Sequence, residues 1–166
     1  RKQIITLISW TAVILWLVII FSLSAQPVNK SNGLSKKVTE VVVETVEKVA
    51  PKTDFNFNRM NHVVRKNAHF FSYLILGILM INAIGRSEVA GFKVFIFSFL
   101  FCVFYAISDE VHQLFVSGRG AQVIDVILDS AGAIVGIGLY GVKSRMRKKE
   151  KHLYGLNVLS NKQSME

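Results

Sequence analysis

Motifs that identify several common enzyme classes are missing from this sequence. Cys102 is the only cysteine among 166 residues, so the chain can form neither an intramolecular disulfide nor a cysteine zinc cluster. It contains no HExxH zinc motif, no P-loop and no nucleophile elbow, and it has no internal repeat or low-complexity tract. An active site in this chain must therefore be assembled from residues that lie far apart in the sequence.

Charged residues are few, at 19%, whereas hydrophobic residues make up 51% of the chain. A helix that crosses a bilayer needs roughly 20 mainly apolar residues, and several stretches approach that length. The first is too long for the apolar core of a signal peptide, which has about 7 to 15 residues, so we expect it to be retained. We therefore predict an all-α integral membrane four-helix bundle, with spans at about residues 4–24, 68–84, 92–108 and 123–142.

The one long polar connection, residues 25–67, begins where Gln26 and Pro27 end the first span. Within it, four valines recur at near-helical spacing, glutamates occupy the more polar side, and Pro51 provides a stop. The valines are Val38, Val42, Val46 and Val49, and the glutamates are Glu40, Glu44 and Glu47. We predict a short amphipathic helix in this outer loop, either a strut at the membrane surface or a lid over a site.

The net charge of +9 lies largely between Lys143 and Lys151, directly after the last apolar run. Anionic lipid headgroups suit such a tail better than nucleic acid does. We expect membrane lipids as partners, and no nucleic acid. The chain thus divides into a membrane domain, residues 1–142, and a basic tail, residues 143–166.

Lysine and arginine in short loops favour the cytoplasmic side of a membrane. The basic tail therefore predicts a cytoplasmic C-terminus, and four spans place the N-terminus on the same side. The short loop with Arg86 and Lys93 falls there too. Because the 25–67 connection is also basic, this multi-pass orientation depends on the tail and the short loops.

The same topology brings three distant segments to one membrane face, the outer one. They are residues 65–69, the segment SDEVHQLFVSGR at residues 108–119, and the start of the last span. Residues three or four apart share a helix face. The resulting sets are Lys66, His69 and Tyr73; Tyr105, Asp109 and His112; Glu110 and Gln113; and Asp125, Asp129, Gly132 and Gly136. The two glycines form a GxxxG motif, which permits close packing of helices.

Asp129 is the most informative of these residues because it lies about two turns inside its span. An ionisable group at the bilayer centre costs about 2.5–3.5 kcal/mol on insertion scales and usually faces a partner or a cavity. His69 or Lys66, at the head of the second span, is the expected partner. A structural salt bridge would explain any one of these residues, but the whole cluster favours a functional site.

Carboxylates and histidines in low-dielectric surroundings can perform general acid and base catalysis. Lys66 and Arg119 could hold an anionic group such as the phosphate of a lipid headgroup, with the SGRG turn as a flexible seat for the arginine. A divalent metal on His69, Asp109, Glu110, His112 or Asp125 is chemically possible. Because no metalloenzyme spacing is present, we predict no metal site.

The sequence resembles the VanZ-like family of bacterial membrane proteins in three segments. They are FSLSAQP at the end of the first span, KNAHFFSYLILG in the second, and SDEVHQLFVSGRGAQVIDVILDSAGAIVG across the third and fourth. The resemblance implies the bacterial cell membrane and a link to resistance against the glycopeptide teicoplanin, without a defined reaction. The family pattern marks Lys66, His69, Tyr73, Asp109, Glu110, Gln113, Arg119, Asp125 and Gly132. In this chain Asp129 stands where the pattern often has asparagine, and Ser117 where it often has proline.

These observations predict a cell-envelope protein that binds, and could modify, a lipid-linked or cell-wall precursor at the outer membrane face. The predicted catalytic residues are His69 and Glu110 as acid and base, with Asp109 and Asp125 orienting them. The predicted substrate-binding residues are Lys66, Tyr73, His112, Gln113, Arg119 and Asp129. The main alternative is a membrane factor without enzyme activity that binds the glycopeptide antibiotic or changes its access; a proton-coupled transporter and a purely structural polar bundle are two more.

Overall fold

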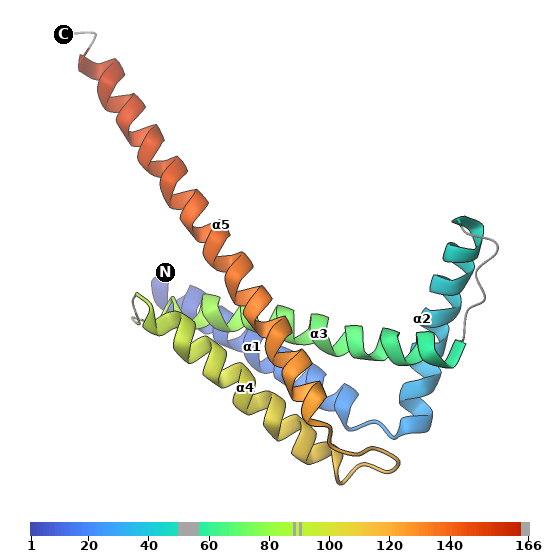
Figure 1. Cartoon of the computed structure of the whole chain (residues 1–166). Coiled ribbons are helices and arrows are strands. Elements are labelled where there is room, and N and C mark those ends of the chain that lie inside the picture. Colours follow the sequence, from blue (N-terminus) through green and yellow to red (C-terminus); the bar gives the residue numbers. More distant parts are fainter. Residues whose placement is uncertain (50–56, 88, 90, 164–166) are drawn as a thin grey trace.

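The computed structural model describes residues 1–49, 57–87, 89 and 91–163, which form helices and no strand. Figure 1 shows the helices lying across one another, with the last one projecting from the rest. The helices are α1 (Lys2–Ser24), α2 (Val28–Val49), α3 (Phe57–Ile84), α4 (Lys93–Gln113) and α5 (Val123–Gln163).

Four of these helices contain a segment long and apolar enough to cross a membrane. The segments are Lys2–Ser24, Met60–Ile84, Lys93–Gln113 and Val123–Arg147. Large apolar side chains cover their outer surfaces; Leu7 and Phe104, for example, are each 68% exposed. Such surfaces are unfavourable in water and expected in lipid. The predicted four-helix membrane bundle is confirmed.

Two helices are longer than hydropathy indicated. The chain is already helical at Phe57, well before the predicted start of the second span near Ala68, and α4 continues past Ser108 to Gln113. Asp109, Glu110 and Gln113 in this last turn are buried. Hydropathy falls at these polar residues, whereas the backbone continues the helix because their side chains face neighbouring segments.

Helix α3 is the centre of the bundle and packs most extensively against α5. At Gly132 a Cβ atom would collide with the carbonyl oxygen of Phe70, and at Gly136 with that of Leu74. The GxxxG motif of α5 therefore lies directly on the backbone of α3, as small residues at membrane interfaces allow. This contact sets the distance between the polar side chains of the two helices.

Side-chain hydrogen bonds tie α1 to its neighbours. Trp16 Nε1 donates to the Ser72 carbonyl of α3 at 2.9 Å, and the Tyr105 hydroxyl of α4 donates to the Leu17 carbonyl at 2.7 Å. In bacteriorhodopsin such bonds contribute about 0.6 kcal/mol each on average. Cys102 is fully buried in the core between the helices, which agrees with a packing role.

Helix α2 is the expected amphipathic helix, and a buried threonine forms part of its contact with α3. Thr39 is fully buried, and its hydroxyl lies 3.4 Å from Asn61 Oδ1. Val38 and Val41 are 53% and 63% exposed. The start of α3 is polar, so small hydroxyl side chains pack there. Figure 1 shows α2 at the end of α3, beside the bundle rather than within it.

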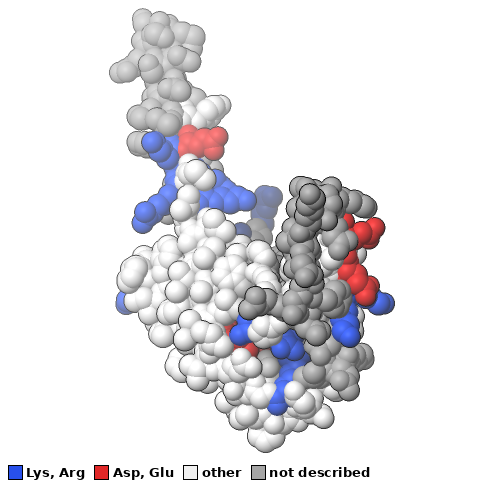
Figure 2. Space-filling view, turned by 45° about the vertical axis from the view of Figure 1, so that its right-hand side comes forward, with Lys and Arg blue, Asp and Glu red and all other residues white. Residues whose placement is uncertain are grey.

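Helix α5 continues far beyond the bundle without a break at the predicted boundary between residues 142 and 143 (Figure 1). The basic residues at and beyond the end of its candidate span are exposed; they are Lys143, Arg145, Arg147 and Lys149. Figure 2 shows blue side chains gathered where the projecting segment leaves the mostly white body. This is the distribution expected where a helix leaves the apolar part of a bilayer.

Candidate functional site

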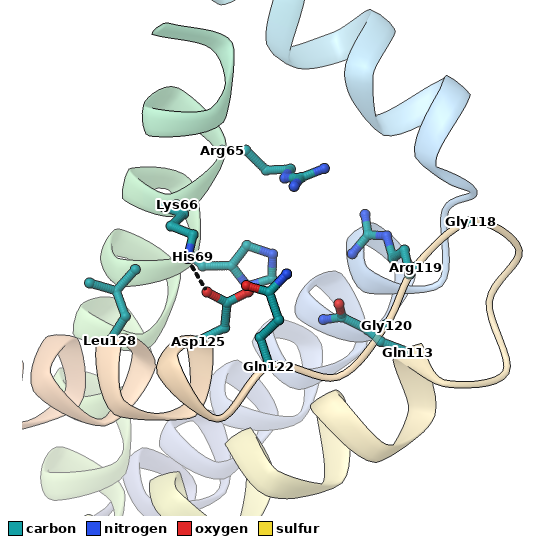
Figure 3. A pocket seen from close by; sticks show the side chains of 10 residues that line it. All are labelled: Arg65, Lys66, His69, Gln113, Gly118, Arg119, Gly120, Gln122, Asp125 and Leu128. Carbon is teal, nitrogen blue, oxygen red and sulfur yellow. Dashed lines mark ion pairs between the residues drawn. The ribbon is translucent and has the colours of Figure 1, made fainter. Parts of the chain in front are cut away.

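A polar pocket of about 90 Å³ lies where the three predicted segments meet. Helix α3 enters this end of the bundle, α4 ends here, and α5 begins here after a short loop (Figure 1). The lining residues are Arg65, Lys66 and His69 from α3, Gln113 from α4, Gly118, Arg119, Gly120 and Gln122 from the loop, and Asp125 and Leu128 from α5 (Figure 3).

The loop between α4 and α5 is held in place by Glu110. This side chain is 4% exposed, and its Oε2 accepts the backbone N–H of Gln122 at 2.8 Å. Gly118 adopts a positive φ of 77°, which a residue with a Cβ rarely adopts. Together they reverse the chain so that Arg119 faces the pocket. Glu110, which was predicted as an acid or base, thus positions the loop through its contact with the Gln122 backbone.

Lys66 and Asp125 form an ion pair at the edge of the pocket. Lys66 Nζ lies 2.7 Å from Asp125 Oδ1, and each side chain is about a quarter exposed. Figure 3 shows this pair beside His69. Lys66 therefore pairs with Asp125 and not with Asp129, which lies one turn further along α5.

Arg119 faces the pocket opposite Arg65 (Figure 3). One Nη of Arg119 lies 3.5 Å from the Leu23 carbonyl, a weak contact with the end of α1. Burial lowers the pKa of the Arg119 guanidinium, and the positive charge of Arg65 lowers it further. Two cations held around one space favour an anion between them.

Beneath the pocket, His69 meets two buried carboxylates. His69 Nδ1 lies 3.8 Å from Asp129 Oδ2, so His69 is the basic side chain beside Asp129. This distance is too long for a hydrogen bond. Asp129 is fully buried and Asp109 is 3% exposed. The histidine on α3 therefore has one carboxylate beside it from α5 and another nearby from α4.

Ser24 is a member of this site that the sequence analysis did not single out. Gln113 Nε2 donates to Ser24 Oγ at 2.9 Å and lies 3.4 Å from Asp109 Oδ2. Ser24 is the last residue of α1, so this short chain of contacts links the end of α1 to the acidic cluster. Ser24 belongs to the FSLSAQP segment that carries part of the family resemblance, and this was the signal that pointed to it.

Three predicted substrate-binding residues do not line the pocket. One is Asp129, which lies beneath it beside His69; the others are Tyr73 and His112. Tyr73 is fully buried below the pocket, with its ring 6.3 Å from that of Tyr105. His112 packs against Phe21, with ring centroids 4.5 Å apart. A role for any of the three in direct binding stays a prediction.

These features define a multi-pass α-helical membrane protein with a charged pocket at one end of its bundle. The chain belongs to the VanZ/LLP1 family, whose model matches residues 9–144. Neither a curated protein nor a solved structure matches it. The resemblance found in the sequence is thus confirmed: this is a VanZ-like membrane protein, linked through its family to antibiotic resistance.

Proposed function

We propose that the pocket binds the phosphate of a lipid-linked cell-wall precursor. The supporting observation is the placement of Arg65, Lys66 and Arg119 around one small open space at the end of the bundle. Arginine and lysine side chains are the usual protein ligands for phosphate. Lys66 forms an ion pair with Asp125 at the rim of the same pocket.

The size of the pocket defines which part of the ligand enters it. Sites that enclose drug-sized molecules have volumes of about 300–1,000 Å³, whereas this pocket has about 90 Å³. It therefore suits a phosphate group and not a whole precursor or a glycopeptide. The lipid chain would remain in the bilayer, next to the apolar outer surface of the helices. His69, in the lining, would be in position to exchange a proton with a phosphate oxygen.

The proposal places the pocket on the outer face of the cell membrane, with both termini in the cytoplasm. The exposed basic residues at and beyond the end of the α5 span support this orientation. On this face the pocket would meet lipid-linked cell-wall precursors that have reached the outer leaflet of the membrane.

Binding is tested with purified protein in lipid nanodiscs and a panel of cell-wall lipid intermediates, each beside its dephosphorylated form. Arg119→Gln removes one pocket cation; Arg86→Gln is the control, because Arg86 lies at the other end of α3 and donates to Asn82 Oδ1 at 3.0 Å. Hydrogen bonds to charged groups contribute about 1.5–3 kcal/mol. Arg119→Gln should therefore weaken binding roughly 10- to 100-fold, with Arg86→Gln unchanged.

Equal binding of phosphorylated and dephosphorylated lipids would refute the proposal. Conversion of a bound intermediate by the wild type, lost in His69→Ala and Glu110→Gln, would establish an enzyme. Binding without conversion would establish a recognition protein. If the glycopeptide antibiotic binds and none of the lipid intermediates does, the protein is better described as a membrane factor that changes the access of the antibiotic to the envelope.

A further inference from the structure

Three side chains of the kinds that bind metals converge beneath the pocket, each from a different helix. They are His69 of α3, Asp109 of α4 and Asp129 of α5. One potential ligand atom from each lies within 4.8 Å of the other two, and His69 Nδ1 is 3.8 Å from Asp129 Oδ2. The sequence predicted no metal site because the chain has no metalloenzyme motif. Such a motif places its ligands close together in the sequence, whereas these three residues come from three different helices.

The carboxylate oxygens of this cluster lack the partners that burial requires. Both carboxylate oxygens of Asp129 and Oδ1 of Asp109 lack a hydrogen-bond partner among the residues that the structure describes. The two side chains are 0% and 3% exposed. Buried carboxylates are normally paired, hydrogen-bonded or bound to metal. A proton would satisfy one oxygen, whereas a cation between the three side chains contacts oxygens of both carboxylates at once.

The surroundings of Asp109 resemble the outer shell of a metal site. Its Oδ2 lies 3.4 Å from Gln113 Nε2, which is itself fixed by Ser24, while Oδ1 has no partner in the described part of the chain. Carboxylates that bind metals are commonly hydrogen-bonded through such outer-shell groups. The close contact of Gly132 with Phe70 fixes the backbone beside Asp129 against the backbone beside His69.

We propose that His69, Asp109 and Asp129 bind one divalent transition-metal ion, of the class of Zn²⁺ or Mn²⁺. Imidazole and carboxylate together suit these ions. Bonds of about 2.0–2.2 Å to a tetrahedral ion place ligand atoms roughly 3.3–3.6 Å apart. The 3.8 Å between His69 and Asp129 is close to this range, and the three ligand atoms, all within 4.8 Å of one another, would close around the ion. Three protein ligands leave a coordination position toward the pocket that His69 lines. The site does not depend on the proposed lipid ligand.

The test uses full-length protein purified with a tag that contains no histidine. After treatment with a chelator, it is titrated with ZnCl₂ or MnCl₂, and bound metal is measured by mass spectrometry. We expect about one equivalent per chain and a loss of affinity of at least roughly 100-fold in His69→Ala and Asp129→Asn. Gln113→Ala, which removes the outer-shell contact, should weaken binding about 10- to 100-fold.

Matched controls separate this site from adventitious binding. His62→Ala removes an exposed histidine of α3, and Asp125→Asn removes the α5 carboxylate that pairs with Lys66; both should retain the metal. Less than a tenth of an equivalent in the wild type would overturn the proposal, as would unchanged affinity in Asp129→Asn. The wild-type titration decides the matter even where a variant fails to fold. Arg119→Gln should keep the metal while losing the lipid phosphate, so the two proposals fail separately.

Discussion

Replacing Gly136 by alanine is expected to force α3 and α5 apart. The new methyl group would overlap the Leu74 carbonyl, and ordinary contact between heavy atoms is about 3.5–4.0 Å. The helices would have to separate by more than roughly 1 Å at this point to restore it. Overpacking of this kind costs about 1–3 kcal/mol.

Gly138→Ala is the matched control, because a Cβ at Gly138 meets nothing within 4 Å in the described structure. Both substitutions gain the same helix propensity, up to about 1 kcal/mol, so their difference isolates the collision. We expect Gly136→Ala to be less stable than Gly138→Ala by about 1–3 kcal/mol in detergent unfolding. Equal stability of the two variants within about 0.5 kcal/mol would refute the close packing of α3 on α5.

Three further predictions concern separate parts of the molecule. A double-mutant cycle of Lys66→Met and Asp125→Asn should give a coupling of about 0.2–1 kcal/mol, because the pair is partly exposed; a coupling above about 3 kcal/mol would indicate a desolvated pair. Tyr105→Phe should destabilise the protein by about 0.6–1.7 kcal/mol through loss of its bond to the α1 backbone, measured by unfolding in detergent; an unchanged stability would argue against that bond. In a variant without the native cysteine, an impermeant maleimide should label the exposed position Ser117→Cys on intact cells and Lys149→Cys only after permeabilisation. The reverse pattern would invert the proposed orientation.

Most of the bundle could be predicted from the sequence, because a helix that crosses a bilayer needs a long apolar segment and hydropathy detects such segments. The sequence also indicated the convergence of the polar segments, since four spans bring the head of α3, the end of α4 and the start of α5 to one face. Within this cluster, the expected partner of Asp129 was His69 or Lys66; the structure places His69 beside it and gives Lys66 to Asp125.

The remaining details depend on side-chain packing that periodicity does not encode. Hydropathy ends a span at its first polar residues, so it missed the last turn of α4, where Asp109 and Glu110 are buried. Valine spacing predicted the amphipathic helix α2 but not which side chain packs on α3, where Thr39 is buried beside Asn61. The sequence carried no separate signal for Ser24, because its contact with Gln113 joins segments far apart in the chain.

Helix α5 runs without a break from the pocket end of the bundle to Gln163. At 1.5 Å per residue, Asp125 lies about 16 Å from the contact at Gly136, and Gln163 lies about 40 Å beyond it. A tilt about that fulcrum that moves the pocket end by about 1 Å therefore sweeps the far end by about 2.5 Å in the opposite direction. Such a tilt would couple the pocket at one end of the bundle to the far end of α5, with the displacement growing along the helix beyond Gly136.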